Sequence, residues 1–203
     1  MFTRSILVSA AALAPLVVPP SAPPVEGPPA GTYTIDATHS TLLFRARHLG
    51  VAYFYGRFNG FKGEIVVDPA KAENSRVSVE IEMDSVDTAS KGRDDHLKSP
   101  DFFDAVQFPT ATFTSTSVKK KGDKHHVVAG KLSLHGVERN VTLEMETVGH
   151  GETPRGLRAG FHGVLDLKRS DFDMKFMLPD GVGDEVQVIL AIEAVQGAKS
   201  KSR

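Results

Sequence analysis

The sequence has no cysteine and no tryptophan among its 203 residues, and its charges almost cancel, with 24 Lys plus Arg against 25 Asp plus Glu. The absence of cysteine excludes disulfide bonds, thiol nucleophiles and cysteine-ligated zinc sites, so stability must come from an apolar core. No basic stripe with interleaved aromatic residues is present, which argues against a nucleic-acid partner. The motifs Gly-x-Ser-x-Gly and His-Glu-x-x-His and a phosphate-binding glycine loop are also missing. We therefore expect no catalytic site of these kinds and no metal site.

The first 30 residues differ in composition from the rest. Met1–Val18 carries one positive charge, at Arg4, followed by a nearly continuous apolar run. This pattern is typical of a secretory leader and is too short to span a bilayer core of about 30 Å. Pro15–Ala30 holds seven of the twelve prolines, which favours an extended linker. We predict a signal peptide at 1–22, a proline-rich linker at 23–31, one folded domain at 32–196 and a polar tail at 197–203. The predicted localisation is exported, periplasmic or secreted, without a stable membrane span; an uncleaved anchor is the alternative.

Apolar and polar residues alternate with a period of two along most of the folded region. In Arg76–Asp84, the apolar residues Val77, Val79, Ile81 and Met83 alternate with charged or polar ones. Similar alternation recurs at 42–46, 128–134, 141–145, 157–167 and 186–192. Strict alternation gives each strand one buried face and one solvated face, which indicates antiparallel sheet. We predict eight or nine strands.

Turn-forming residues separate these strands. Lys121–Asp123 and His135–Glu138 each predict a hairpin between two alternating runs. Gly149–Gly156 predicts a longer loop, because it combines several glycines with a proline.

Two segments depart from simple alternation. Asn59-Gly60 interrupts a strand-like run from Phe54 to Val67, and the apolar residues change face there, which predicts a β-bulge. Ala89–Asp104 shows no alternation and predicts one or two short helical turns, with Ser99 before a proline as a helix start.

About eight amphipathic antiparallel strands can bury their apolar faces in a sandwich or in a closed barrel. Long strands and the predicted bulge favour an all-β barrel, because closure requires the strands to bend. An eight-stranded barrel is wide enough to be filled by side chains or to hold one small ligand. Small residues on the inner face either leave room or accommodate strand curvature, and they are Ala46, Gly56, Gly63, Gly130, Ala159 and Gly163.

Several short motifs occur in a fixed order along the chain. They are Ile35-Asp36 with His39-Ser40, Gly56-Arg57-Phe58, Ser85–Thr88, Arg93–Asp104, Gly130–Arg139 and Arg169–Phe172. In these motifs, from Tyr33 to Ala194, the chain resembles the YceI-like family of exported polyisoprenoid-binding proteins. The resemblance implies an extended lipocalin-like antiparallel β-barrel of about eight strands with one or two short helical segments. One departure is Asp173, which replaces the glycine that usually follows the Arg-Ser-Asp-Phe motif in this family.

The resemblance also implies a ligand. We expect the barrel to bind a long-chain apolar or amphiphilic molecule, such as a polyisoprenoid, a prenyl quinone or a similar lipid, as carrier or store, with no covalent cofactor. Such a partner needs an apolar tunnel rather than a catalytic site, because each buried methylene contributes about 0.8 kcal/mol. The candidate lining residues are Leu42, Phe44, His48, Phe54, Phe58, Phe61, Phe102, Phe103, Phe113, Leu132, Leu134 and Phe161. Of these, Phe102 and Phe103 are expected to close one end.

Polar residues in the family motifs are candidates for a headgroup site or rim at the barrel mouth, and they are Arg93, Asp94, His96, Arg169 and Asp171. Asp94 alternatively accepts hydrogen bonds from Arg93 or from backbone amides at a helix start. His39, His48 and His96 are the histidines that could form a metal cluster. No spacing among them fixes two ligands on one face, so we favour structural hydrogen bonds for them.

Two other functions stay open on the sequence alone. The first is an enzyme that acts on an isoprenoid-type lipid through a His/Asp site at the barrel mouth, with His48 or His96 as the base. The second is a ligand-free structural barrel with a fully packed interior. A homodimer is also compatible with the sequence.

Overall fold

The computed structural model describes residues 27–197. Within this range the chain forms eleven strands, one short α-helix and three 3-10 segments. The strands are β1 (Gly31–Ile35), β2 (Thr41–His48), β3 (Ala52–Phe58), β4 (Phe61–Val67), β5 (Arg76–Glu82), β6 (Val86–Asp87), β7 (Thr110–Lys120), β8 (His125–Leu134), β9 (Val137–Thr153), β10 (Gly156–Lys168) and β11 (Val182–Gln196). The helix is α1 (Lys91–Leu97), and the 3-10 segments are η1 (Ala72–Asn74), η2 (Met83–Ser85) and η3 (Arg169–Phe172).

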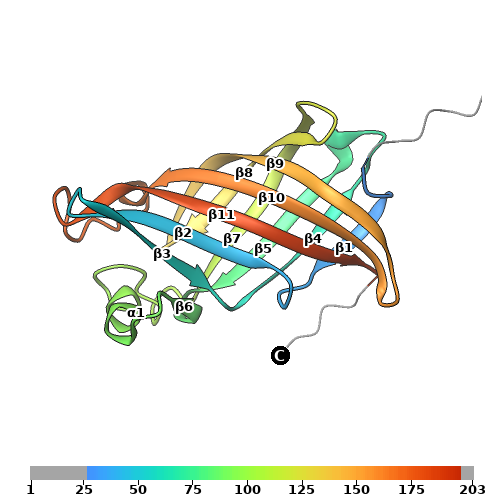
Figure 1. Cartoon of the computed structure of the whole chain (residues 1–203). Coiled ribbons are helices and arrows are strands. Elements are labelled where there is room, and N and C mark those ends of the chain that lie inside the picture. The colour runs from blue at the N-terminus through green and yellow to red at the C-terminus, as the bar shows by residue number, and fades with distance from the viewer. Residues whose placement is uncertain (1–26, 198–203) are drawn as a thin grey trace, which may run out of the picture.

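The strands form one antiparallel sheet that closes into a barrel. Its order is β1-β4-β5-β7-β8-β9-β10-β11, and β1 also pairs with β11 to complete the ring of eight. β2 pairs with the same edge of β11 as β1 does, but nearer to the start of β11; β3 and β6 follow β2 in the sheet, and α1 lies beside them (Figure 1). The predicted antiparallel barrel of about eight strands with a short helical segment is therefore confirmed.

The prediction of a β-bulge at Asn59-Gly60 is wrong, because the chain changes partners at this point. β3 pairs with β2, whereas β4 pairs with β1, so the two strands are separate. The Asn59 amide donates to the Ser85 carbonyl at 3.1 Å, and the Gly60 carbonyl accepts from the Glu82 amide at 2.8 Å. Glu82 at the end of β5 and Ser85 of η2 thus bind the chain where β3 ends and β4 begins. The change of face marks a strand break.

The helix also differs from its predicted start. α1 begins after Ser90 and ends before Ser99, which lies in the turns that follow the helix. The Ser99 side chain donates to the His96 carbonyl at 2.7 Å, so it binds the end of α1 rather than starting a second helix.

The predicted loop at Gly149–Gly156 is largely sheet. β9 continues to Thr153 and β10 starts at Gly156, so only Pro154 and Arg155 form the turn. Gly149 and Gly151 pair with residues of β10, and their missing side chains do not prevent ladder hydrogen bonds. The hairpins predicted around Gly122 and Gly136 are confirmed.

Inward-pointing apolar side chains plug one end of the barrel, which we call the closed end. The buried members of this cluster come mainly from β1, β4, β10 and β11, and they are Tyr33, Ile35, Leu42, Phe61, Ile65, Ala159, Phe161, Ile192 and Ala194. Tyr33 is fully buried, and its hydroxyl donates to the Pro29 carbonyl at 2.8 Å. The packing of this end follows from the alternation of large apolar residues with small ones on adjacent strands.

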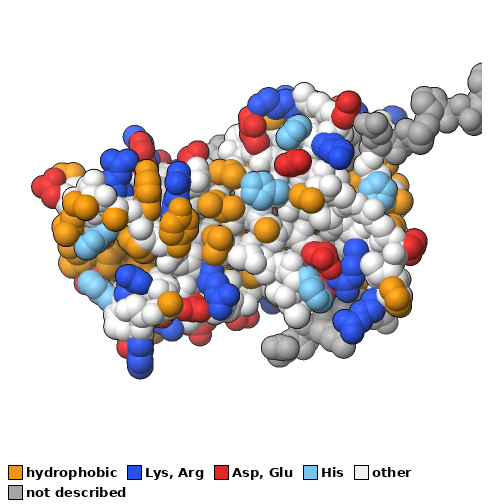
Figure 2. All heavy atoms as spheres, in the orientation of Figure 1, with side chains coloured by type: hydrophobic (Ala, Val, Ile, Leu, Met, Phe, Trp, Pro, Cys, Tyr) orange, Lys and Arg blue, Asp and Glu red, His pale blue; other side chains and the backbone are white. Residues whose placement is uncertain are grey.

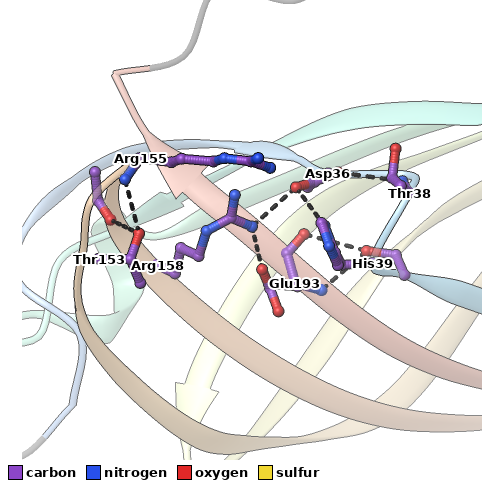
Figure 3. A network of polar contacts seen from close by, with 9 residues as sticks. Asp36, Thr38, His39, Thr153, Arg155, Arg158 and Glu193 are labelled. Carbon is purple, nitrogen blue, oxygen red and sulfur yellow. Dashed lines mark hydrogen bonds and ion pairs between the residues drawn. The ribbon is translucent and has the colours of Figure 1, made fainter.

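A polar network holds the same end together from outside (Figure 3). Between β1 and β2 the chain turns at Asp36, whose carboxylate accepts from Arg158 at 2.8 Å and contacts the His39 ring at 2.9 Å. Arg158 also pairs with Glu193. Burial acts to raise the pKa of Asp36, but the hydrogen bonds from Arg158, His39 and the Thr38 amide outweigh it and lower the pKa to about 2.

The N-terminal segments fall partly outside the described residues. The predicted signal peptide at 1–22 lies there, as do residues 23–26 of the predicted linker and most of the C-terminal tail. The end of the linker packs on the barrel, since Pro28 is buried and the Ala30 carbonyl accepts from the Gln196 side chain at 2.9 Å. Within 27–197, no helix combines the length and the apolar character needed to cross a bilayer.

Candidate functional site: an apolar cavity in the barrel

The barrel encloses a cavity of about 440 Å³ between the closed end and α1. Its wall combines side chains from every strand except β6 with residues of α1 and of the loops on either side. Almost all of the lining is apolar, and polar side chains enter it at His48, Arg93, His96 and Arg169. A volume of this size lies within the range of about 300–1,000 Å³ typical of small-molecule sites.

Small residues on the inner face admit neighbouring rings rather than leaving empty space. Gly56 lies opposite Phe44 on the paired strand, and a Cβ atom at Gly56 would lie 2.3 Å from the Phe44 ring. A Cβ atom at Gly130 would likewise lie 2.5 Å from the Phe113 ring. The glycines therefore let aromatic rings lie close to the sheet, and the cavity lies beyond those rings.

Most of the predicted lining residues border this cavity, and they are Leu42, Phe44, His48, Phe54, Phe58, Phe102, Phe103, Phe113, Leu132 and Leu134. Phe61 and Phe161 do not border it. Both point inward but are buried in the closed-end cluster, beside Tyr33 and Ile65. Alternation identifies the inner face of a strand, but it does not say at which height the interior is filled.

Phe103 and Phe102 cover one side of the cavity from the segment that follows α1. The Phe103 ring meets Phe58 at 5.5 Å and Phe44 at 6.4 Å, measured between ring centroids. The Phe102 ring meets His96 at 5.1 Å and Phe176 at 5.5 Å. The residues expected to close one end thus link α1 to the barrel and to the loop before β11.

Arg93 and Asp94 have different positions relative to the cavity. Arg93 borders it, with its guanidinium carbon 5.4 Å from the centre of the Phe54 ring. Asp94 does not border it, because its carboxylate accepts from the Thr88 amide at 2.8 Å and from the Thr88 hydroxyl at 2.5 Å. Arg93 donates to the same hydroxyl at 2.8 Å. Asp94 thus accepts a hydrogen bond from a backbone amide, which was the alternative to a headgroup contact. The Thr88 hydroxyl connects Asp94 to Arg93, because it donates to the Asp94 carboxylate and accepts from Arg93.

The histidines do not form a metal cluster. His48 and His96 border the cavity mouth, whereas His39 lies in the network around Asp36. His96 contacts Asp101 at 2.8 Å, and no hydroxyl among residues 27–197 hydrogen-bonds to the side chain of His48 or His96. Asp36, His39 and Glu193 are close enough to share an ion, but Arg158 already bridges the two carboxylates.

Arg169 is buried and fixes the loop before β11. Its guanidinium donates to the carbonyls of Met174, Phe176, Val182 and Gly183 at distances from 2.7 to 3.0 Å. Burial lowers the pKa of Arg169 from its usual value, and these four acceptors satisfy the guanidinium donors without a direct carboxylate partner.

Asp171 and Asp173, at the end of the same turn, do not border the cavity. Asp171 is exposed and does not border it. Asp173 adopts the left-handed conformation, with φ of 60°, at the end of η3. Glycine adopts this conformation without strain and aspartate tolerates it, so the departure from the family pattern preserves the turn.

Several cavity residues were missed by sequence reasoning. Met174 and Met177 border the cavity from the irregular segment before β11, Val182 borders it from the first position of β11, and Leu97 borders it from α1. The apolar composition of 174–179 was a usable signal, because an exposed loop seldom carries so many large apolar residues.

A second cavity of about 260 Å³ lies between the loop 68–75 and the β7–β8 hairpin. Ile65, Val77, Val128 and Met145 border both cavities, so these four side chains form a wall between them. Charged residues, including Lys120 and Asp123, reach the second cavity, so it is more polar than the first.

Known proteins are similar to this chain in sequence and in architecture. A family model described as the YceI-like domain matches residues 33–194. The protein YceI of Escherichia coli O157:H7 is 42% identical over 170 residues, which cover 82% of this chain and 88% of that protein. A UPF0312 protein of Pseudomonas aeruginosa (strain LESB58) is 41% identical over 170 residues, with the same two coverages.

Solved structures agree with the fold. BcnA of Burkholderia cenocepacia superposes with a TM-score of 0.74 at 29% identity, covering 79% of this chain and 99% of that one. A polyisoprenoid binding domain from Saccharophagus degradans superposes with a TM-score of 0.61 at 19% identity, covering 81% and 98%. With the barrel, the motif residues and these similarities in agreement, the chain belongs to the YceI-like family.

Proposed function

We propose that this protein binds a long-chain apolar or amphiphilic lipid, such as a polyisoprenoid or a prenyl quinone, inside its barrel and acts as its carrier or store. The observation that carries the proposal is the cavity of about 440 Å³ with its nearly continuous apolar lining. Burial of a hydrocarbon chain in such a space is favourable by about 0.8 kcal/mol per methylene. The ligand class named for the Saccharophagus degradans domain suits this chemistry, although at 19% identity that likeness supports the fold alone.

Polar side chains at the mouth suit the polar end of an amphiphile. His48 and Arg93 both border the cavity, and the Arg93 NH1 group makes no hydrogen bond to residues 27–197. A headgroup at this position would remain near water while its tail filled the apolar space. The proposal therefore orients the ligand with its polar end toward α1.

Two further features of the sequence fit a carrier outside the cytoplasm. The leader at 1–22 supports export, and a cysteine-free chain folds independently of the redox state of its compartment. The Ser99 hydroxyl beside the His96–Asp101 pair donates to the His96 main-chain carbonyl at 2.7 Å and not to the His96 ring, which supports binding rather than catalysis.

The test is to extract the purified protein with organic solvent, analyse the extract by mass spectrometry, and titrate the delipidated protein with polyprenyl alcohols and prenyl quinones. Val188→Trp is the blocking variant, because Val188 borders the cavity and lies opposite Phe44. Removing room for about four methylenes lowers affinity roughly two-hundredfold. Val106→Trp is the control, since Val106 is 95% exposed.

Two results would overturn the proposal. One is equal affinity of the wild type and Val188→Trp for every lipid tested. The other is time-dependent conversion of a lipid to a product that disappears in His96→Ala, which would select the enzyme.

A further inference from the structure

Large apolar side chains are exposed around the mouth of the cavity. At the β2–β3 turn, Leu49 and Val51 are 57% and 86% exposed, and in the loop before β11, Phe176 and Met177 are 39% and 43% exposed. The Leu49 amide donates to the Gly181 carbonyl at 2.8 Å, so the two loops are held side by side. Figure 2 shows hydrophobic side chains gathered over this end of the molecule. We call these four residues, together with Tyr53, the mouth patch.

The mouth patch is continuous with the cavity. Tyr53 and Met177 border the cavity and are also 49% and 43% exposed. An apolar surface therefore runs from solvent into the barrel along Tyr53 and Met177. Exposed apolar surface of this kind is costly in water and typically marks an interaction site.

The charges beside the patch are positive. Residues 41–58 contain Arg45, Arg47 and Arg57 and no Asp or Glu. Arg57 pairs with Asp87, whereas the guanidinium groups of Arg45 and Arg47 lie 4.5 and 5.5 Å from the centre of the Tyr53 ring. Neither Arg45 nor Arg47 makes an ion pair within residues 27–197.

Acidic residues near the patch come from β11 and from the loop before it. The Glu185 carboxylate has an electrostatic interaction with Arg47, and Asp180 precedes Gly181 in the loop. Asp173 is paired with Lys175. The β2–β3 hairpin thus presents two arginines that make no ion pair within residues 27–197, together with a tyrosine and apolar tips, which is the combination that suits the boundary between anionic headgroups and acyl chains.

We propose that the mouth patch docks on the surface of a lipid bilayer that contains anionic lipids. Leu49, Val51, Phe176 and Met177 enter the headgroup region, and Arg45 and Arg47 contact lipid phosphates. An apolar chain can then pass between the bilayer and the cavity without crossing water. This docking goes beyond the binding of a ligand in the barrel and is measurable whether or not a ligand is found.

The experiment is co-sedimentation of the full chain with vesicles of phosphatidylcholine alone and of phosphatidylcholine with phosphatidylglycerol. We expect the wild type to bind the anionic vesicles, and the double variant Val51→Asp/Phe176→Asp to bind them at least about tenfold more weakly, because it places charge in the inserted surface. The matched control is Val148→Asp on β9, where the valine is 59% exposed away from the mouth patch. It should bind as the wild type does.

The charge contribution has its own variant. Arg45→Gln/Arg47→Gln should lose about fivefold in vesicle affinity per arginine and should bind both vesicle types equally. Thermal unfolding of each variant reports whether the barrel is intact, and because Val51 is 86% exposed, Val51→Asp alone should unfold as the wild type does.

Three outcomes would overturn the proposal. The first is wild-type protein that stays in the supernatant with both vesicle types. The second is vesicle binding that Val51→Asp/Phe176→Asp leaves unchanged. The third, from light scattering, is a wild-type dimer that Val51→Asp converts to a monomer without any vesicle binding, since the patch would then be covered by a second copy of the chain.

Discussion

The two ends of the barrel are built from the same alternating strands but differ in what fills them. At the closed end, β1 and β4 complete the ring, and Tyr33, Phe61 and Ala194 lie in a packed cluster. At the mouth, β2 and β3 continue beyond the ring, and α1 with Phe102 and Phe103 covers a cavity instead of a packed core. The closed end contributes most to stability, and the mouth end provides the cavity. The same part of the interior cannot be both closely packed and empty.

The largest expected difference between the two ends is in the free energy of unfolding when a large side chain is removed from each. Tyr33→Ala should lower the free energy of unfolding by about 4 kcal/mol, since Tyr33 is fully buried in a tightly packed cluster. Phe54→Ala should lower it by about 1 kcal/mol, because the Phe54 ring borders space that is already empty. Urea unfolding of both variants measures the difference. Equal losses at the two ends would contradict the division of roles.

Substitution of Arg169 tests whether buried hydrogen bonds stabilise the mouth, in contrast to the apolar packing that stabilises the closed end. Arg169→Met should cost about 3 kcal/mol, because four carbonyl groups lose their donor in a buried position. Hydrogen exchange should show faster opening of 173–183 than of β10. Arg169→Lys is the control, since it keeps the charge but reaches fewer of the carbonyls. Unchanged exchange in both variants would show that the loop is held by other contacts.

The network at the closed end predicts a pH dependence. The pKa of Asp36 is about 2 in the folded protein, below its ordinary value of 3.8, so its contribution is complete above about pH 4 and is lost as the pH falls toward 2. Because Asp36 and Arg158 are only partly buried, solvent screening reduces the contribution to about 1 kcal/mol. Asp36→Asn should remove this part of the pH dependence of unfolding. A wild-type profile that is identical to that of the variant between pH 4 and 2 would contradict the role of the network.

The smallest effect is expected at Asp173. Asp173→Gly should raise the free energy of unfolding by no more than about 0.5 kcal/mol, since relief of the left-handed conformation is partly offset by chain entropy and by loss of the Lys175 pair. Asp173→Ala should be destabilising by about 1 kcal/mol, because alanine lacks the local hydrogen bonds that let aspartate adopt this conformation. Thermal unfolding distinguishes the two signs. Stabilisation by alanine would show that the turn relaxes.

The family motifs proved to be structural in large part. Asp36, His39 and Ser40 hold the break between β1 and β2, and the Ser40 hydroxyl donates to the Glu193 carbonyl at 3.1 Å. Thr88 and Asp94 fix the start of α1. The contacts of these motif residues position the strands and the helix, whereas other motif residues, such as Phe58, Arg93 and Phe103, border the cavity.

The sequence alone determined the antiparallel strands and the inner face of each strand, and it favoured a closed barrel over a sandwich. It did so because a period of two leaves each strand with one face that water disfavours, and eight such faces can be hidden by closing the sheet. The tertiary structure decided how far up the barrel the side chains fill the interior. Phe61 and Phe161 share the inward direction of Phe58 and Phe113, yet only the latter two border the cavity, since the height of a residue in the barrel depends on strand register and on the break at Asn59-Gly60.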